Sequence, residues 1–232
     1  MRTLLHIGTW AMVIVIAMLA WWVKPSGASS LSCEMPELDI PKTEACNLGR
    51  VYPECKWQIP EQEQAEGLYV LWERTPPAER WGSPTLVKLA LKAAYAYTKA
   101  YPGERLTVGD LDAPPDQHKT HNRGMDMDLY LRGSMLSTVE GGGNYRSRST
   151  FEQRMLRARV FDLAKILAQC AQGQIRIYYN DEVVMRWFNP WFWARGWRPP
   201  FGQAMVAHNH SHDYHMHVTV LRPETRFLAI TP

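Results

Sequence analysis

Apolar residues recur along this chain with two different periods, which predicts a mixture of helices and strands. After Ser83-Pro84, a good helix entry, apolar positions recur every three or four residues until Pro102-Gly103. Thr150 and Gln153 have the spacing of a capping box and open a second amphipathic pattern, which is expected to run to about residue 172. Two helices are therefore predicted, with a glycine just after each.

Shorter runs between and around these helices predict strands. They are apolar or strictly alternating, and they cover residues 68–72, 106–108, 125–131, 175–179 and 215–221. Strands and helices follow one another without a regular βαβ rhythm. The expected fold class is α+β, with a small, mostly antiparallel sheet flanked by helices.

The N-terminal residues carry the longest apolar run of the chain. Residues 4–23 follow Arg2 and precede Lys24 and a small-residue tail, as in a secretory signal peptide. About 20 apolar residues also suffice for a membrane anchor. The pattern leaves open whether residues 1–30 are a cleaved signal peptide or an inner-membrane anchor; both place the rest of the chain in the periplasm.

Residues 31–66 are rich in proline and glutamate, show no clean period, and are expected to form an irregular lead-in to a domain at 67–232. Three of the four cysteines lie in this lead-in, and the fourth is Cys170. An even count in an exported chain indicates disulfides, and three pairings are possible. The favoured pair is Cys46–Cys55. No CxxC spacing suggests a cysteine zinc site.

Composition adds little to this picture. The 232 residues are 46% hydrophobic, enough for one sizeable core, and the net charge is only +3. No Lys/Arg run or basic stripe concentrates that charge, so nucleic acid is not an expected partner.

Seven of the eight histidines fall in two clusters that are far apart in sequence. The first cluster has His118 and His121 just before the strand predicted at 125–131. The second spans residues 208–217 and enters the strand predicted at 215–221. A catalytic zinc site uses three His or carboxylate ligands and leaves a fourth position for water.

The predicted strands can bring such ligands together. Alternation places Asp126 and Asp128 on one face of the first strand, and His215 and His217 on one face of the last. If the strands are neighbours, Asp128 and His217 converge from adjacent positions. His121 then reaches in from the preceding loop, in which Gly124 permits a tight turn. Either cluster alone is typical of an exposed strand face or an adventitious metal binder; their complementarity favours a built site.

These residues resemble the zinc peptidases grouped around lysostaphin and the D-Ala-D-Ala carboxypeptidases. The chain is most similar to the penicillin-insensitive murein endopeptidase family, which has a histidine, two residues, a second histidine, then Gly-x-Asp-x-Asp, and a final His-x-x-His-x-His. Here this pattern is matched by His118, His121, Gly124, Asp126 and Asp128, followed by His212, His215 and His217. The resemblance covers roughly residues 80 to 221.

The resemblance implies that His121, Asp128 and His217 bind Zn²⁺, and that His118, His212 and His215 are non-ligand active-site histidines. It implies an endopeptidase that hydrolyses peptide cross-links of peptidoglycan, such as D-alanyl–diaminopimelate bonds, with metal-activated water. No glutamate precedes His217, where the related carboxypeptidases have one. His212 or His215 is therefore expected to transfer a proton or to stabilise the oxyanion.

The chain departs from the family in its loop at 134–149, in His208 and His210, in its cysteine positions and in the lack of a long C-terminal extension. These differences leave the residues of the zinc site unchanged and bear on the substrate alone. A D,D- or L,D-carboxypeptidase that trims stem peptides remains an alternative, as does a noncatalytic zinc-dependent cell-wall-binding module. A two-His, one-carboxylate iron oxygenase fits poorly, because Asp128 lies seven positions after His121 instead of the usual two.

Overall fold

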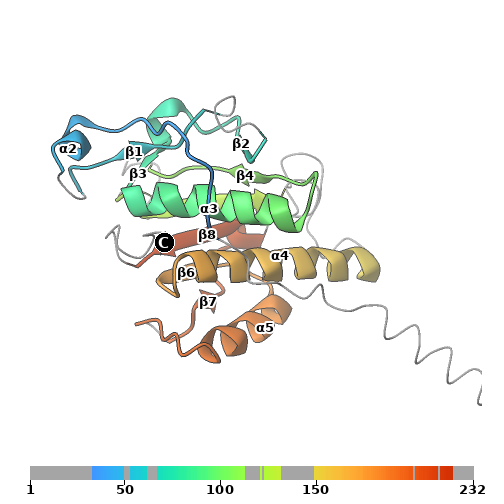
Figure 1. Ribbon diagram of the computed structural model, residues 1–232. Coiled ribbons are helices and arrows are strands. Elements are labelled where there is room, and N and C mark those ends of the chain that lie inside the picture. The colour runs from blue at the N-terminus through green and yellow to red at the C-terminus, as the bar shows by residue number, and fades with distance from the viewer. Residues whose placement is uncertain are drawn as a thin grey trace, which may run out of the picture. The chain divides into compact units, whose positions relative to one another are not determined.

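A computed structural model describes most of the chain after residue 32 (Figure 1). The described residues are 33–49, 53–61, 67–112, 121, 123–131, 149–200, 202–213 and 215–221. They belong to one unit, Ser32–Pro232, which is separate from Met1–Leu31. The predicted signal peptide or anchor, His118, and nearly all of the loop predicted at 134–149 lie outside the described residues.

The described unit is built on a six-stranded mixed sheet. In spatial order its strands are β2 (Tyr69–Leu71), β4 (Leu106–Val108), β5 (Asp126–Leu131), β8 (Met216–Val220), β6 (Ile175–Tyr178) and β7 (Met205–Val206). The three central pairings are antiparallel, and the outer pairings, β2 with β4 and β6 with β7, are parallel. The α+β fold class is confirmed, and each predicted strand is present to within one or two residues.

The two predicted helices are also present, as α3 (Pro84–Ala100) and α4 (Thr150–Cys170). The hydroxyl of Ser83 caps α3 by accepting a hydrogen bond from the backbone N–H of Leu86 at 3.2 Å. Gly173, with φ of 77°, lies just beyond α4 and donates its N–H to the carbonyl of Ala168 at 2.8 Å. Thr150 is the first residue of α4 and not its cap, a shift of one residue from the prediction.

A third helix, α5 (Glu182–Trp193), was not predicted. Asp181 caps it: one carboxylate oxygen accepts hydrogen bonds from the N–H groups of Val183 at 2.9 Å and Val184 at 3.3 Å. Its buried residues Val184, Phe188 and Phe192 recur every four residues, so the helical period is present, but the dense run of Trp and Phe and the internal Pro190 obscure it in the sequence.

The sheet has one apolar face and one polar face. Met127, Leu129 and Val218 are fully buried on the apolar face. Helices α3 and α4 lie side by side over the sheet in Figure 1 and provide the partner for that face. The opposite face of β5, β8 and β6 carries the aspartates, histidines and aromatic side chains, so the polar chemistry of the chain is gathered on one side.

The lead-in segment has more regular structure than expected. It contains α2 (Glu44–Asn47) and β1 (Trp57–Gln58), and β1 pairs with β3 (Trp81–Gly82) just before α3. Two short 3₁₀ turns, Pro77–Glu79 and His210–Asp213, complete the described elements.

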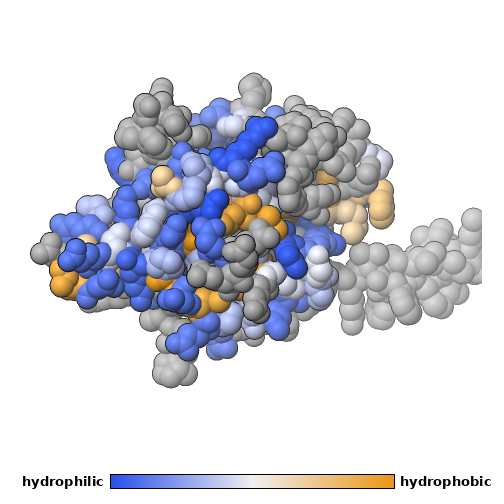
Figure 2. Space-filling model, turned by 90° about the horizontal axis from the view of Figure 1, so that it is seen from above, coloured by the Kyte–Doolittle hydropathy of each residue, from blue (hydrophilic) through white to orange (hydrophobic). Residues whose placement is uncertain are grey.

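All four cysteines are paired. The predicted Cys46–Cys55 bridge is present, and a second bridge joins Cys33 to Cys170 at the end of α4. These disulfides are consistent with an oxidising, exported compartment. Within the described ranges, no helix is long and apolar enough to cross a membrane. The face seen in Figure 2 is mainly hydrophilic where its residues are coloured.

Candidate metal centre

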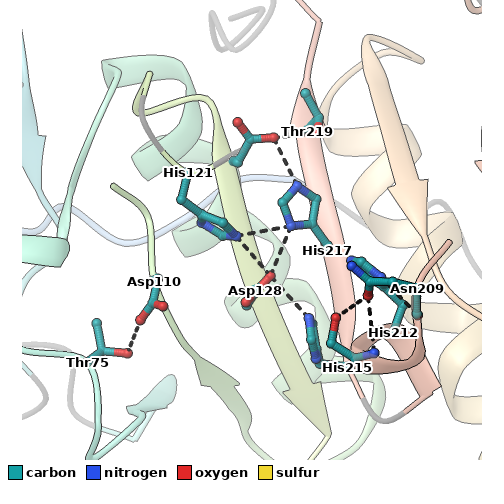
Figure 3. Close-up of polar contacts among 11 residues, drawn as sticks. Thr75, Asp110, His121, Asp128, Asn209, His212, His215, His217 and Thr219 are labelled. Carbon is teal, nitrogen blue, oxygen red and sulfur yellow. Dashed lines mark hydrogen bonds and ion pairs between the residues drawn. The ribbon is translucent and has the colours of Figure 1, made fainter. Parts of the chain in front are cut away.

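The strand pairing brings the two histidine clusters together as the alternation predicted. β5 and β8 are antiparallel neighbours, and Asp128 lies directly opposite His217. His121 reaches the same point from the loop before β5, and Figure 3 shows the three side chains pointing toward one another. The ligand atoms of all three residues lie within 4.8 Å of one another, inside the limit of about 6 Å that a shared metal ion allows.

The individual distances fit a single metal ion with tetrahedral geometry. Nε2 of His121 lies 3.0 Å from Nδ1 of His217, and these nitrogens lie 3.3 Å and 3.2 Å from Oδ1 of Asp128. Ligands bound at 2.0–2.1 Å in a tetrahedron are separated by about 3.3 Å. The three side chains are therefore spaced as ligands of one small cation, and His121, Asp128 and His217 form a group that could hold a metal ion.

The environment of Asp128 also favours a cation. All three ligand residues are buried, and Oδ1 of Asp128 has no hydrogen-bond donor in suitable geometry despite the nearby imidazole nitrogens. Burial opposes ionisation of this carboxyl, but His215, with further contributions from His121 and His217, holds its pKa well below the usual range. A buried, ionised carboxylate oxygen without a hydrogen bond is costly unless a cation satisfies it.

Asp126 orients the ring of His217 by contacting the nitrogen that faces away from Asp128. Its Oδ1 lies 3.0 Å from Nε2 of His217 and accepts a hydrogen bond from the hydroxyl of Thr219 at 2.5 Å. A proton held on Nε2 leaves Nδ1 of His217 free to face Asp128 and a metal ion, the usual arrangement of a carboxylate behind a ligating histidine. Burial lowers the pKa of His217, but the hydrogen bond to Asp126 and the negative charges of Asp128 and Asp126 outweigh it and raise the pKa to about 9.

The loop that carries His121 is braced by close backbone contacts. Gly124 has φ of 59°, so the predicted tight turn is present. Its carbonyl accepts a hydrogen bond from the N–H of Ser83 at 2.7 Å. A Cβ at Gly124 would lie 3.1 Å from the Cα of Gly82. The start of α3 and the His121 loop are thus held together at a distance that a side chain at Gly124 would disturb.

Of the three predicted non-ligand histidines, the structure places two beside the ligands. Nε2 of His215 lies 3.4 Å from Oδ1 of Asp128, and the ring centroid of His212 lies 5.2 Å from that of His215. Burial, followed by the nearby His215 and His217, lowers the pKa of His212 to about 4. His212 is therefore an unprotonated imidazole at neutral pH. His118 lies outside the described residues.

Several residues shape the site without having been predicted. Alternation placed Asp126 on the correct face, but nothing in the sequence assigned Asp126 or Thr219 to His217. Asn180 holds the 3₁₀ turn that carries His212: its N–H donates to the carbonyl of His212 at 3.0 Å, and its side-chain amide donates to the carbonyl of Asn209 at 2.7 Å. These contacts depend on tertiary structure that local pattern does not encode.

Gly109 is a further residue of this kind. Its N–H donates to the carbonyl of Asp128 at 2.8 Å. A Cβ there would lie 3.2 Å from the Cβ of Asp128 and 3.1 Å from the ring of Tyr130. The close approach of β4 to the metal ligand therefore needs a glycine.

The chain matches no family model, no curated protein and no solved structure, so the interpretation of this site rests on its own geometry and chemistry.

Proposed function

We propose that this protein is a zinc-dependent endopeptidase that hydrolyses peptide cross-links of peptidoglycan in the periplasm. The observation that carries the proposal is the spacing of His121, Asp128 and His217, which matches three ligands of one tetrahedral cation and leaves a fourth position. The resemblance of the surrounding motif to murein endopeptidases supports the substrate class, and the disulfides support an exported protein.

The donor set favours zinc among the divalent cations. Two imidazoles and one carboxylate suit Zn²⁺, whereas Mg²⁺ and Ca²⁺ prefer oxygen ligands in sites of six or more. When bound, zinc polarises the scissile carbonyl and activates water as a nucleophile. The three ligand residues are held by two strands and a loop: Asp128 is on β5, His217 is on β8 and His121 is in the loop before β5. Their side chains are only 2–6% exposed, which keeps competing solvent away.

His212 and His215 are assigned to proton transfer and to charge stabilisation. His212 is not a ligand and its ring centroid lies 5.6 Å from that of His217, so we assign to it the proton transfer from the attacking water. His215 faces Asp128 through Nε2, where an imidazole beside the ligand carboxylate can donate a hydrogen bond to negative charge that develops in the reaction. Through its hydrogen bond to Nε2, Asp126 keeps the His217 ring in the orientation that points Nδ1 at the metal position.

The test is hydrolysis of purified peptidoglycan and of a cross-linked muropeptide dimer by the full-length protein loaded with zinc, followed by mass spectrometry of the products. Conversion of dimer to monomers that stops with chelator and returns with zinc is the expected result. Asp128→Asn should abolish it, whereas Asp162→Asn, a carboxylate on α4 that contacts Lys165, should leave it intact.

Release of a terminal residue without breakdown of dimers would instead identify a carboxypeptidase. Zinc-dependent binding to peptidoglycan without any cleavage would identify a noncatalytic wall-binding module. Cleavage that survives Asp128→Asn would contradict the assignment of the metal ligands.

A further inference from the structure

A row of rings crosses the polar face of the sheet and passes beside the metal centre. It runs from Trp72 to Tyr130, His215, His212 and His208, with successive ring centroids 5.0, 5.1, 5.2 and 4.9 Å apart. Trp72 follows β2, Tyr130 is on β5, and the histidines lie at or before the start of β8. The row therefore runs across the strands and not along them.

An open pocket lies at each end of this row. The Trp72 pocket, bordered by Trp72, Glu61, Glu73, Arg80 and Arg105, has a volume of about 370 Å³. The His208 pocket, bordered by His208, Arg157, Glu182, Arg186 and Asp213, has a volume of about 440 Å³. Each is large enough for a small ligand or for one or more residues of a peptide.

The walls of the His208 pocket are fixed by hydrogen bonds that also fix the active-site histidines. The side-chain carbonyl of Asn180 accepts from the N–H of His208 at 2.8 Å, and its amide donates to Asp213 at 2.9 Å. The N–H of the same residue donates to the carbonyl of His212. One asparagine thus ties this pocket to the candidate proton acceptor, so a ligand in the pocket lies next to the reacting groups.

Both pockets carry charges of both signs. In the His208 pocket, Arg157 pairs with the buried Asp181 at 2.8 Å, while Glu182 and Arg186 are exposed. A pocket of this kind repels a polyanion as much as it attracts one, and it complements a ligand that carries an ammonium and a carboxylate together.

The Trp72 pocket follows the same pattern. Arg80 makes two hydrogen bonds to Glu61, at 3.0 and 2.8 Å, and Glu73 and Arg105 are exposed. The aromatic face of Trp72, which is only partly buried, adds a surface on which a flat or apolar group can pack. The two pockets therefore offer similar chemistry. The Trp72 pocket adjoins β2 and the His208 pocket adjoins the end of β6, so in the order of the sheet they lie on either side of β5 and β8, which carry Asp128 and His217.

We propose, building on the peptidase function above, that these pockets are subsites for the two peptide segments that flank the scissile bond, each binding charged groups of its segment through side chains of both signs. The substrate crosses the strands along the row of rings and is held on both sides of the metal. The successive ring spacings add up to about 20 Å, which is the upper limit of the length of the row, and a peptide of up to about six extended residues spans that length. An endopeptidase must bind an extended peptide segment on each side of the scissile bond, whereas a carboxypeptidase needs an extended binding site on one side only.

The experiment measures kcat and KM for a cross-linked muropeptide dimer with three variants of the full-length, zinc-loaded protein. Glu182→Gln with Arg186→Gln changes the His208 pocket, and Glu73→Gln with Arg105→Gln changes the Trp72 pocket. Lys99→Gln, an exposed residue on α3 outside both pockets, is the matched control. Each double variant should raise KM about fivefold with little change in kcat, because exposed charged contacts are modest, and Lys99→Gln should change neither.

Two further measurements make the test decisive. Dimers in which the free carboxyl groups of one strand are amidated should bind the wild type more weakly. The variant of the pocket that bound that strand should show no further loss of affinity for the amidated dimer. Calorimetry of the unmodified dimer with metal-free protein measures the pockets independently of hydrolysis.

The proposal is overturned if either double variant keeps the KM and affinity of Lys99→Gln, since the substrate would then be held on one side only. If the wild type binds the dimer through both pockets but does not cleave it, the subsites stand and the peptidase function fails. If the wild type neither binds nor cleaves the dimer, both fail.

Discussion

Asp126 provides a sharp test of how the metal centre is held, because it should contribute to metal affinity without touching the ion. Its Oδ1 lies 3.0 Å from Nε2 of His217, on the side of the ring away from Asp128. Removing this acceptor in Asp126→Ala releases the ring orientation and the tautomer that present Nδ1. Loss of such a partner typically weakens metal binding 10- to 100-fold, which corresponds to about 1.4–2.7 kcal/mol.

Two milder variants separate orientation from charge. Asp126→Asn keeps an oxygen that can accept from Nε2 but loses the negative charge, so its affinity should lie between those of the wild type and the alanine variant. Thr219→Val removes only the hydroxyl that donates to Asp126 at 2.5 Å, and it should weaken binding by no more than about threefold.

The assay is competition for Zn²⁺ against a chromophoric chelator at fixed pH, with circular dichroism as a check that each variant is folded. The order of affinities should be wild type, then Thr219→Val, Asp126→Asn and Asp126→Ala. A dissociation constant for Asp126→Ala within twofold of the wild-type value would refute the role of Asp126, and with it the use of Nδ1 of His217 as the ligand atom.

Three other predictions follow from the described contacts. Gly109→Ala places a Cβ 3.2 Å from that of Asp128 and should therefore weaken zinc binding about three- to tenfold in the same competition assay. Unchanged zinc affinity would show that the backbone at Gly109 can move away from Asp128 freely. In denaturant titrations, removing the Cys33–Cys170 bridge should lower the free energy of unfolding by about 5 kcal/mol, and removing Cys46–Cys55 should lower it by about 3 kcal/mol. The first loss is larger because the bridged residues are 137 positions apart, against 9 for the second; the reverse order would contradict this loop-entropy reasoning. Because the pKa of His217 is raised to about 9 in the metal-free protein, zinc binding at neutral pH should release close to one proton, measured by calorimetry in buffers of different ionisation enthalpy. Zinc affinity should also rise with pH up to about 9, and an affinity that falls over this range would contradict the prediction.

The pairing of the ligand strands could be predicted because each strand has one buried polar face and one apolar face. Alternation fixes which residues share a face, and a shift of one residue would bury Asp128 among apolar side chains. The sequence therefore placed Asp128 and His217 correctly once the strands were taken as neighbours, and the structure pairs them directly. Gly124 was predictable for a similar local reason, since its turn needs a positive φ.

Other features depend on contacts that the sequence does not encode locally. In helix α5 the buried Val184, Phe188 and Phe192 are spaced four residues apart, but the many Trp and Phe residues around them and the internal Pro190 obscured this period. The two-residue strand β7 exists because β6 offers it a parallel edge, and no periodicity marks so short an element. The Cys33–Cys170 bridge joins residues 137 positions apart, and four cysteines alone allow three pairings.

The most direct test of the account is an anomalous-diffraction crystal structure of the zinc-loaded protein. We predict one zinc ion bound by Nε2 of His121, Nδ1 of His217 and a carboxylate oxygen of Asp128, each at about 2.0–2.2 Å. Zinc bound instead by the histidines at 208 and 210, or no bound zinc at this position, would contradict the account.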